Sequence, residues 1–252
     1  MFRFFKKKQA EKNNSFDDFP AIGGLMVSKM IVDKKFKLGF MYREKRTRPE
    51  DSGWRIFSGH ETEEYTNNPS NAGIYNPSTI LEIDPSIADL LLKGVGAVYE
   101  RTGGNKWHKV TDYKMQDDYM VTHKLGQSWT ITINNLFERT LEENGDLLYT
   151  TGDKSVRLAI WNEEKSRENI YAKHAAIIKD RDETVARTLQ TFEFSDAEVA
   201  RIGYLINEGD KNKNYSVLNG FSITDNQLIQ VALYFDDEVD INWAIETWKN
   251  IK

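Results

Sequence analysis

Hydrophobic and polar residues alternate in short runs along the first half of the chain, as they do in half-buried β-strands. The runs that predict strands lie at 25–32, 36–42, 53–57 and 96–101. Asp33–Lys35 is short enough to join the first two as a hairpin. In the third run the period of two directs Trp54 and Ile56 to one face of the strand, and Arg55 and Phe57 to the other.

Polar and turn-forming residues separate these strands and mark one helix. Residues 60–78 are rich in Asn, Pro and Ser, which predicts one long surface loop or two short ones. A short helix is expected from 84 to 92, with Asp84 as its N-cap, Pro85 at the first helical position and Gly94 as its stop. A second polar stretch at 111–118 is the expected boundary between two domains.

The second half repeats the strand pattern and adds two helices. Its predicted strands lie at 129–133, 137–141, 147–149, 156–161, 189–194, 200–206, 215–224 and 228–235. The last two form a hairpin across Asp225–Gln227. A helix is expected from 167 to about 182 with Ser166 as its N-cap.

The final helix has the clearest pattern in the chain. Its apolar positions recur at helical spacing and comprise Trp243, Ala244, Thr247, Trp248 and Ile251. Four acids precede it: Asp236, Asp237, Glu238 and Asp240. Helix capping explains these acids, since the helix macrodipole favours negative charge at the N-terminus; a calcium site is the alternative.

Strands outnumber helices and follow one another directly, so the fold class is α+β, with mainly antiparallel sheets and one or two packed helices in each domain. We expect a flexible basic tail at 1–20, an α+β domain at 21–112 and a second, acidic α+β domain at 113–252. A membrane-surface anchor built on Phe2, Phe4 and Phe5 is the alternative for the tail.

Composition narrows the possible functions. The 252 residues include no Cys, which excludes disulfides, thiolate catalysis and Cys-ligated metals and fits a cytoplasmic protein. No apolar run approaches the roughly 20 residues that span a bilayer.

The two halves of the chain differ in charge. Residues 1–112 hold 18 Lys and Arg against 15 Asp and Glu, whereas the remainder holds 16 Lys and Arg against 24 Asp and Glu. The acidic half argues against nucleic-acid binding and suits a basic protein partner, or it simply keeps the chain soluble.

The sequence contains no recognisable catalytic motif. The four His residues are scattered, at His60, His108, His123 and His174. The run from His60 lacks the second His of a metalloprotease helix, because Glu64 stands at that position. His174 is expected to be a packing or surface residue. Nucleophile-elbow and Walker-type loops are absent, so we predict no catalytic residues, no cofactor and no metal, with a metal site at His60 as the alternative.

Several segments of the first half, taken in order, resemble one family. They are Tyr42–Glu44, Asp51–Glu61, Glu64–Tyr65, Gly73–Tyr75, Asp84–Pro85 and Gly96–Arg101. Together they resemble the DUF2185 family, also called the Imm33 group of bacterial immunity proteins, over about residues 21–112. The family usually has an acidic residue immediately before the position of Glu61, where this chain has His60.

The resemblance implies a non-catalytic protein that binds and neutralises a toxin or effector in the bacterial cytoplasm. The residues we expect at the partner-binding edge are Arg43, Glu44, Trp54, Arg55, His60, Glu61, Glu63, Glu64 and Tyr65. Trp54 could instead pack in the core of the domain. The charged residues could instead form a rim that only contacts solvent. The alternative functions are a small-molecule, metal-binding or hydrolytic domain that uses His60 and nearby carboxylates, and a scaffold or chaperone-like module.

Overall fold

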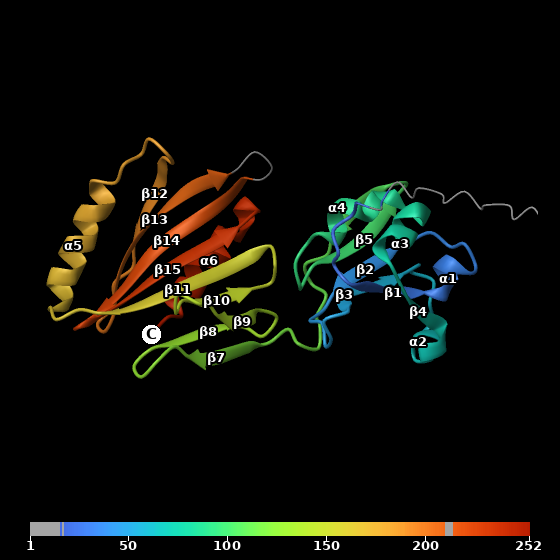
Figure 1. Ribbon diagram of the computed structural model, residues 1–252, viewed down its shortest axis with the longest axis horizontal. Helices are drawn as coiled ribbons and strands as arrows, with labels where there is room; N and C mark the ends of the chain where they lie inside the picture. The colour runs from blue at the N-terminus through green and yellow to red at the C-terminus, as the bar shows by residue number, and fades with distance from the viewer. Residues whose placement is uncertain (1–15, 17, 210–213) are drawn as a thin grey trace, which may run out of the picture. The chain divides into compact units, whose positions relative to one another are not determined.

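The computed structural model describes residue 16 and residues 18–209 and 214–252 (Figure 1). Most of the predicted tail, residues 1–15 and 17, lies outside the described residues. The chain divides into two compact units: Met1–Lys93 with Ala97–Tyr113, termed unit 1, and Gly94–Gly96 with Lys114–Lys252, termed unit 2. Each combines sheets with a few helices, so the predicted α+β class is confirmed.

Unit 1 is built on a six-stranded sheet with the order β4-β1-β3-β2-β5-β6. Its strands are β1 (Gly24–Ser28), β2 (Phe40–Arg43), β3 (Asp51–Phe57), β4 (Ala72–Tyr75), β5 (Val98–Gly103) and β6 (Lys106–Lys109). Strands β1 and β3 are parallel, and the other neighbouring pairs are antiparallel. Strand β3, which contains the predicted strand at 53–57, therefore lies in the interior of the sheet with a strand on each side.

Short helices cover one face of this sheet: α1 (Lys29–Val32), α3 (Pro77–Ile83) and α4 (Ala88–Leu91), with a 3-10 turn at Pro85–Ile87. Helix α2 (Glu63–Thr66) and the 3-10 turn Pro69–Asn71 add no buried residue to that face. Residues of α1, α3 and α4 join Trp54 and Ile56 in one core, where both side chains are fully buried. The predicted alternation of β3 residues between the two faces of the sheet is therefore confirmed. Arg55 and Phe57 lie on the face opposite this core, termed the pocket face.

The predicted hairpin at 25–42 is wrong. The chain leaves β1 at Ser28, whose Oγ accepts a hydrogen bond from the Met30 backbone N–H (3.3 Å) and caps α1. Ile31 reaches the core from this helix rather than from a strand. Strand β1 then pairs with β3 and β4 instead of β2, because a buried central strand gains more from covering both of its edges than from one local turn.

The loop predicted at 60–78 is also wrong in large part. It contains α2, one 3-10 turn, β4 and the start of α3. Pro77 occupies the first turn of α3, where its missing N–H costs nothing, so a residue that suggested a turn begins a helix. The helix predicted from 84 is confirmed as a 3-10 turn followed by α4, and Asp84 accepts from the Ser86 backbone N–H (3.1 Å).

Unit 2 is built on a seven-stranded antiparallel sheet, in the order β12-β13-β14-β15-β11-β10-β9, and a two-stranded β7–β8 hairpin. Its strands are β7 (Met120–Lys124), β8 (Thr130–Asn134), β9 (Glu138–Leu141), β10 (Leu147–Thr150), β11 (Lys154–Asn162), β12 (Thr188–Glu193), β13 (Ala200–Gly209), β14 (Asn214–Thr224) and β15 (Gln227–Phe235). All eight predicted strands are present, whereas β4 and β6 in unit 1 and β7 here were not predicted as strands.

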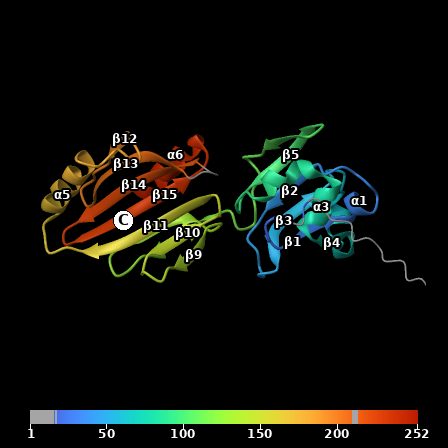
Figure 2. The same cartoon turned by 45° about the horizontal axis from the view of Figure 1, so that its top comes forward.

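Two helices cover opposite faces of the seven-stranded sheet. Helix α5 (Arg167–Lys179) packs along β13 and β14 in both views (Figures 1 and 2). Ser166 caps it by accepting from the Asn169 N–H (3.4 Å), as predicted. His174 is buried, with Nδ1 2.8 Å from the Ile170 carbonyl oxygen, so its expected packing role is confirmed.

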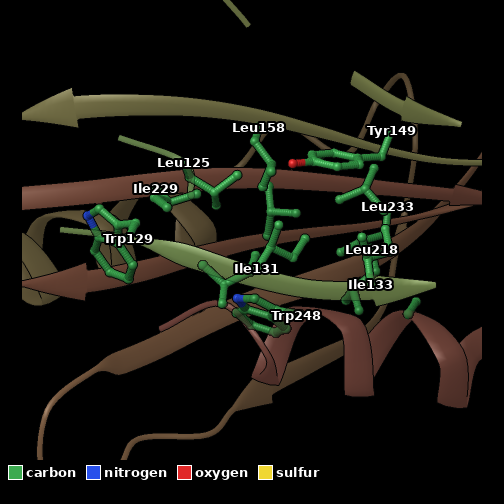
Figure 3. Packing of buried hydrophobic residues seen from close by; sticks show 14 of the residues in the cluster. Leu125, Trp129, Ile131, Ile133, Tyr149, Leu158, Leu218, Ile229, Leu233 and Trp248 are labelled. Atoms are coloured by element: carbon green, nitrogen blue, oxygen red, sulfur yellow. The ribbon is translucent and has the colours of Figure 1, made fainter. Parts of the chain in front are cut away.

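Helix α6 (Ile241–Lys249) and strand β8 form the other core of unit 2. Figure 3 shows Ile131 and Ile133 of β8 with Trp248 of α6, packed among side chains of the large sheet. Of the acids before α6, Asp237 caps the 3-10 turn Glu238–Asp240 by accepting from the Val239 N–H (3.2 Å). Asp240 is the N-cap residue of α6 but makes no side-chain capping hydrogen bond, and it pairs with Lys154 Nζ instead (2.7 Å). In the described residues, no helix has both the length and the apolar character that a membrane crossing requires.

Candidate functional site

The pocket face of unit 1 carries a hollow of about 420 Å³ over its central strands. This volume falls within the range of roughly 300–1,000 Å³ that is common for binding pockets. Strands β1, β2 and β3 form the floor, and α2 and the turn after it form one wall. The lining residues are Met26, Ser28, Tyr42, Glu44, Arg55, Phe57, Glu61, Tyr65, Thr66, Asn68, Pro69, Asn71 and Ala72.

Arg55 is the buried charge at the floor of this pocket. Its residue is 6% exposed, and its guanidinium binds Asp51 in a bidentate manner, Nη1 to Oδ1 at 2.9 Å and Nη2 to Oδ2 at 2.7 Å. Nε also donates to Glu44 Oε1 at 2.6 Å. Two carboxylates thus compensate one buried guanidinium, as burial of a charge requires.

The sheet register explains this network. Antiparallel pairing puts Tyr42 of β2 opposite Arg55, and parallel pairing puts Met26 of β1 beside it. Asp51 reaches Arg55 from four residues earlier on the same strand, where Gly53 between them has φ +81° and its N–H donates to Asp51 Oδ1 (2.9 Å). The hydrogen bonds from Arg55 keep the pKa of Asp51 below its ordinary value despite burial.

Glu61 fixes the other end of the pocket. Its Oε1 accepts from the backbone N–H and the hydroxyl of Ser58, both at 2.9 Å, and its Oε2 accepts from the Gly59 N–H at 2.9 Å. Burial alone would raise the pKa of Glu61, but hydrogen bonds from Ser28 and Ser58 bring it below its ordinary value. The carboxylate is therefore ionised at neutral pH and held in one position.

Aromatic rings form much of the remaining surface. Tyr42 and Phe57 stack with ring centroids 6.1 Å apart and an interplanar angle of 12°. Tyr113 and Phe40 extend this group, at 5.2 Å and 6.0 Å from Tyr42. Burial, with the nearby Tyr113 and Glu44, raises the pKa of Tyr42 to about 12, so its hydroxyl stays neutral. On the far wall Tyr65 lies in the pocket, and Lys34 Nζ lies 5.5 Å from its ring centroid.

The structure brings together four of the nine residues expected at the binding edge: Glu44, Arg55, Glu61 and Tyr65. The other five lie elsewhere. Trp54 is fully buried in the core and donates from Nε1 to the Leu91 carbonyl (3.0 Å), and Arg43 donates to the Lys93 carbonyl (2.5 Å). His60 is exposed, and its ring contacts that of Phe36 in a tilted arrangement with centroids 5.4 Å apart, while the acids at the start of α2, Glu63 and Glu64, face solvent.

Sequence reasoning missed several pocket residues, chiefly Met26, Ser28, Tyr42 and Phe57. The alternation in β3 contained the signal for Phe57, since it shares a face with Arg55. Tyr42 and Met26 needed the register of two neighbouring strands, which the sequence does not fix.

Most polar groups at the pocket are held by neighbours within unit 1. Glu61 accepts from Ser58, Glu44 Oε1 accepts from Arg55, and His60 is not among the lining residues. Throughout the described part of the chain, no group of three or more His, Asp or Glu side chains is placed to hold a metal ion.

A comparison with protein-family models matches the segment that forms the pocket. Residues 25–111 match the family model described as the immunity protein Imm33 domain, which confirms the resemblance over the N-terminal half. No curated protein matches the chain. Among solved structures, the chain is similar to cyanobacterial PsbP (CyanoP) from Synechocystis sp. PCC 6803, with 8% identity and a TM-score of 0.40, over 57% of this chain and 96% of that one. A similarity at that level supports no conclusion about fold or function.

Proposed function

We propose, from the match of residues 25–111 to the Imm33 immunity protein domain, that this chain is an immunity-type protein. It binds a cognate bacterial toxin or effector in the cytoplasm and neutralises it without catalysis. The match is the observation that carries the proposal, because every residue that lines the pocket lies within the matched residues.

The pocket face is the surface we assign to the partner. Protein interfaces gain most of their affinity from a few aromatic and Arg anchors in well-packed pockets, surrounded by a polar rim. Tyr42, Phe57 and Tyr65 supply aromatic area, and Glu44 and Glu61 supply charge beside it. The other predicted residues contribute differently: Arg43 and Trp54 hold the sheet and core, whereas His60, Glu63 and Glu64 extend the rim.

The test is protection from toxicity. A toxin gene adjacent to the gene for this chain is expressed alone and together with the full chain in a heterologous bacterium, and growth and co-purification are measured. We expect arrest with the toxin alone, growth with both proteins, and a stoichiometric complex. Growth arrest in both cultures, with both proteins present and folded, would contradict the proposal.

Matched variants locate the surface. Replacing Phe57 and Tyr65 by Ala should abolish protection, while Ile177→Ala on the exposed side of α5 should leave it intact. Circular dichroism and melting temperature identify any variant that fails by unfolding. If only Ile177→Ala abolishes protection, the interface lies on unit 2 and the assignment to the pocket face is wrong.

A further inference from the structure

The pocket on the face of β1, β2 and β3 has a net negative charge. Among its lining residues Glu44 and Glu61 contribute two carboxylates and Arg55 contributes one guanidinium, and Asp51, bound to Arg55, adds a further carboxylate behind it. Glu44 uses Oε1 to accept from Arg55, and no described residue donates to Oε2. The Glu44 side chain is 38% exposed, so this oxygen remains accessible to a ligand.

An anionic ligand does not suit this pocket, although Arg55 lies at its floor. Both edges of the guanidinium are already bound to carboxylates, with distances of 2.6–2.9 Å. An incoming anion would have to displace Asp51 or Glu44 and would then lie beside the displaced carboxylate. Like charges placed together in a partly buried site cost free energy, so the pocket selects against anions.

The aromatic rings of the pocket provide faces on which a cation can bind. Tyr42 and Phe57 stack at one side of the pocket, and Tyr65 lies in the opposite wall. A cation over such a ring is attracted by the negative face of its π-system. Lys34 Nζ, 5.5 Å from the Tyr65 centroid, shows that this ring accepts a cation within the chain itself.

We propose that the pocket binds the guanidinium of an arginine side chain presented by the partner protein. The guanidinium would lie against the rings of Tyr42 and Phe57 and donate hydrogen bonds to Glu44 Oε2, with Glu61 completing the charge balance. Arginine fits better than lysine because its planar, weakly hydrated group stacks on aromatic faces while its N–H groups point outward in the plane toward an acceptor such as Glu44 Oε2. The proposal rests on the proposed function for the presence of a protein partner.

The pocket can be tested without the partner by using N-acetyl-arginine amide as a probe on the full chain. Ring resonances of the pocket aromatics are followed by nuclear magnetic resonance, with the isosteric, neutral N-acetyl-citrulline amide as the matched ligand. We expect saturable shifts with the arginine probe and an affinity about tenfold lower for the citrulline probe, equivalent to about 1.4 kcal/mol.

Variants of the protein provide the second comparison. Glu44→Gln keeps an oxygen that accepts from Arg55 and removes the charge, so it should weaken arginine binding about tenfold. Glu82→Gln, on the exposed surface of α3 and outside the pocket, should leave the affinity unchanged. Equal affinities for the arginine and citrulline probes, equal losses in the two variants, or shifts that do not saturate would each overturn the proposal.

The outcome separates this inference from the proposed function. If the chain protects against a toxin but the arginine probe fails to bind, the arginine site is wrong and the immunity role stands. If the probe binds in the pocket and no toxin is neutralised, the site stands as a guanidinium receptor and the immunity role is wrong.

Discussion

At the scale of single residues, Arg55 is the group on which the pocket depends most. A guanidinium with 6% exposure has lost most of its hydration, and only its hydrogen bonds to Asp51 and Glu44 compensate for that loss. Its position on a central strand keeps both carboxylates at one end of the pocket. The network therefore contributes both to the stability of unit 1 and to the charge of the pocket.

Asp51→Asn tests the stability part of this role. The amide cannot bind the guanidinium in a bidentate manner, so we expect the free energy of unfolding to fall by about 3 kcal/mol, as for a broken buried pair. Urea unfolding followed by Trp fluorescence measures the change. Glu50→Gln, at the exposed neighbouring position, should alter it by less than about 0.5 kcal/mol. Equal effects of the two substitutions would show that the network adds nothing to stability.

The same carboxylates predict how stability depends on pH. The pKa values of Asp51 and Glu61 lie below the ordinary values of 3.8 and 4.5, so the unfolded chain binds these protons more tightly. The stabilisation is complete above those ordinary values and is lost as the pH falls through the lower folded-state values. Unfolding free energies measured from pH 7 to pH 3 should decline below about pH 4.5, less steeply in Asp51→Asn. A flat profile over that range would be inconsistent with the hydrogen-bond network.

At the scale of elements, α6 lies against glycines of the large sheet. A Cβ at Gly220 of β14 would lie 2.6 Å from Trp248 Cε2, and one at Gly203 of β13 would lie 2.7 Å from Trp248 Cη2. The indole is fully buried and donates from Nε1 to Ser222 Oγ (3.1 Å). The two glycines provide the space in which the Trp248 ring packs on the sheet.

Gly220→Ala should therefore destabilise unit 2 by about 1–3 kcal/mol through overpacking. In the Trp248→Phe background the smaller ring leaves room for the added methyl group, so the same substitution should cost less. A double-mutant cycle from denaturant unfolding measures this coupling. Additive effects would indicate that the methyl group is accommodated without contact with residue 248.

Prediction from the sequence worked best where an element is defined by its own neighbours. The β14–β15 hairpin crosses a two-residue turn, Asp225 and Asn226, within the predicted segment, and α6 has its own acidic start and apolar stripe, so local pattern was sufficient. It failed at 25–42, where β1 takes its partners from β3 and β4 farther along the chain. Local alternation carries no information about such pairings.

The candidate site was predictable to the same extent. Arg55 and Glu61 lie in one short motif whose residue types are unusual together, and both line the pocket. Trp54 belongs to the same motif, yet it faces the core because successive residues of a strand alternate. The α2 wall was expected to be loop, since four helical residues are too few to show a periodicity.

At the scale of the whole molecule, each unit has a core of its own. Fully buried Trp54 lies in the core of unit 1, and fully buried Trp248 lies in that of unit 2. We propose that these units correspond to the two domains expected at 21–112 and 113–252. Separate cores allow the two units to unfold in separate transitions.

Trp54→Ala tests this organisation. Removing a fully buried indole should destabilise unit 1 by about 3–5 kcal/mol, while amides of unit 2 keep their protection from hydrogen exchange. Hydrogen exchange measured by mass spectrometry resolves the two sets of amides. Equal loss of protection in both units would show that the chain unfolds as one cooperative body.

The order of strands in unit 1 also bears on self-association. Strand β6 forms one edge of the six-stranded sheet and carries Lys106 and Lys109, whose charges oppose the approach of another strand. Strand β4 forms the other edge with the uncharged sequence Ala-Gly-Ile-Tyr, where Ile74 is 65% exposed. The short length of β4, rather than charge, limits pairing with a strand of another molecule there. At high protein concentration we therefore expect strand pairing between molecules to begin at β4. A lysine at position 74 would give this edge the charge that protects β6.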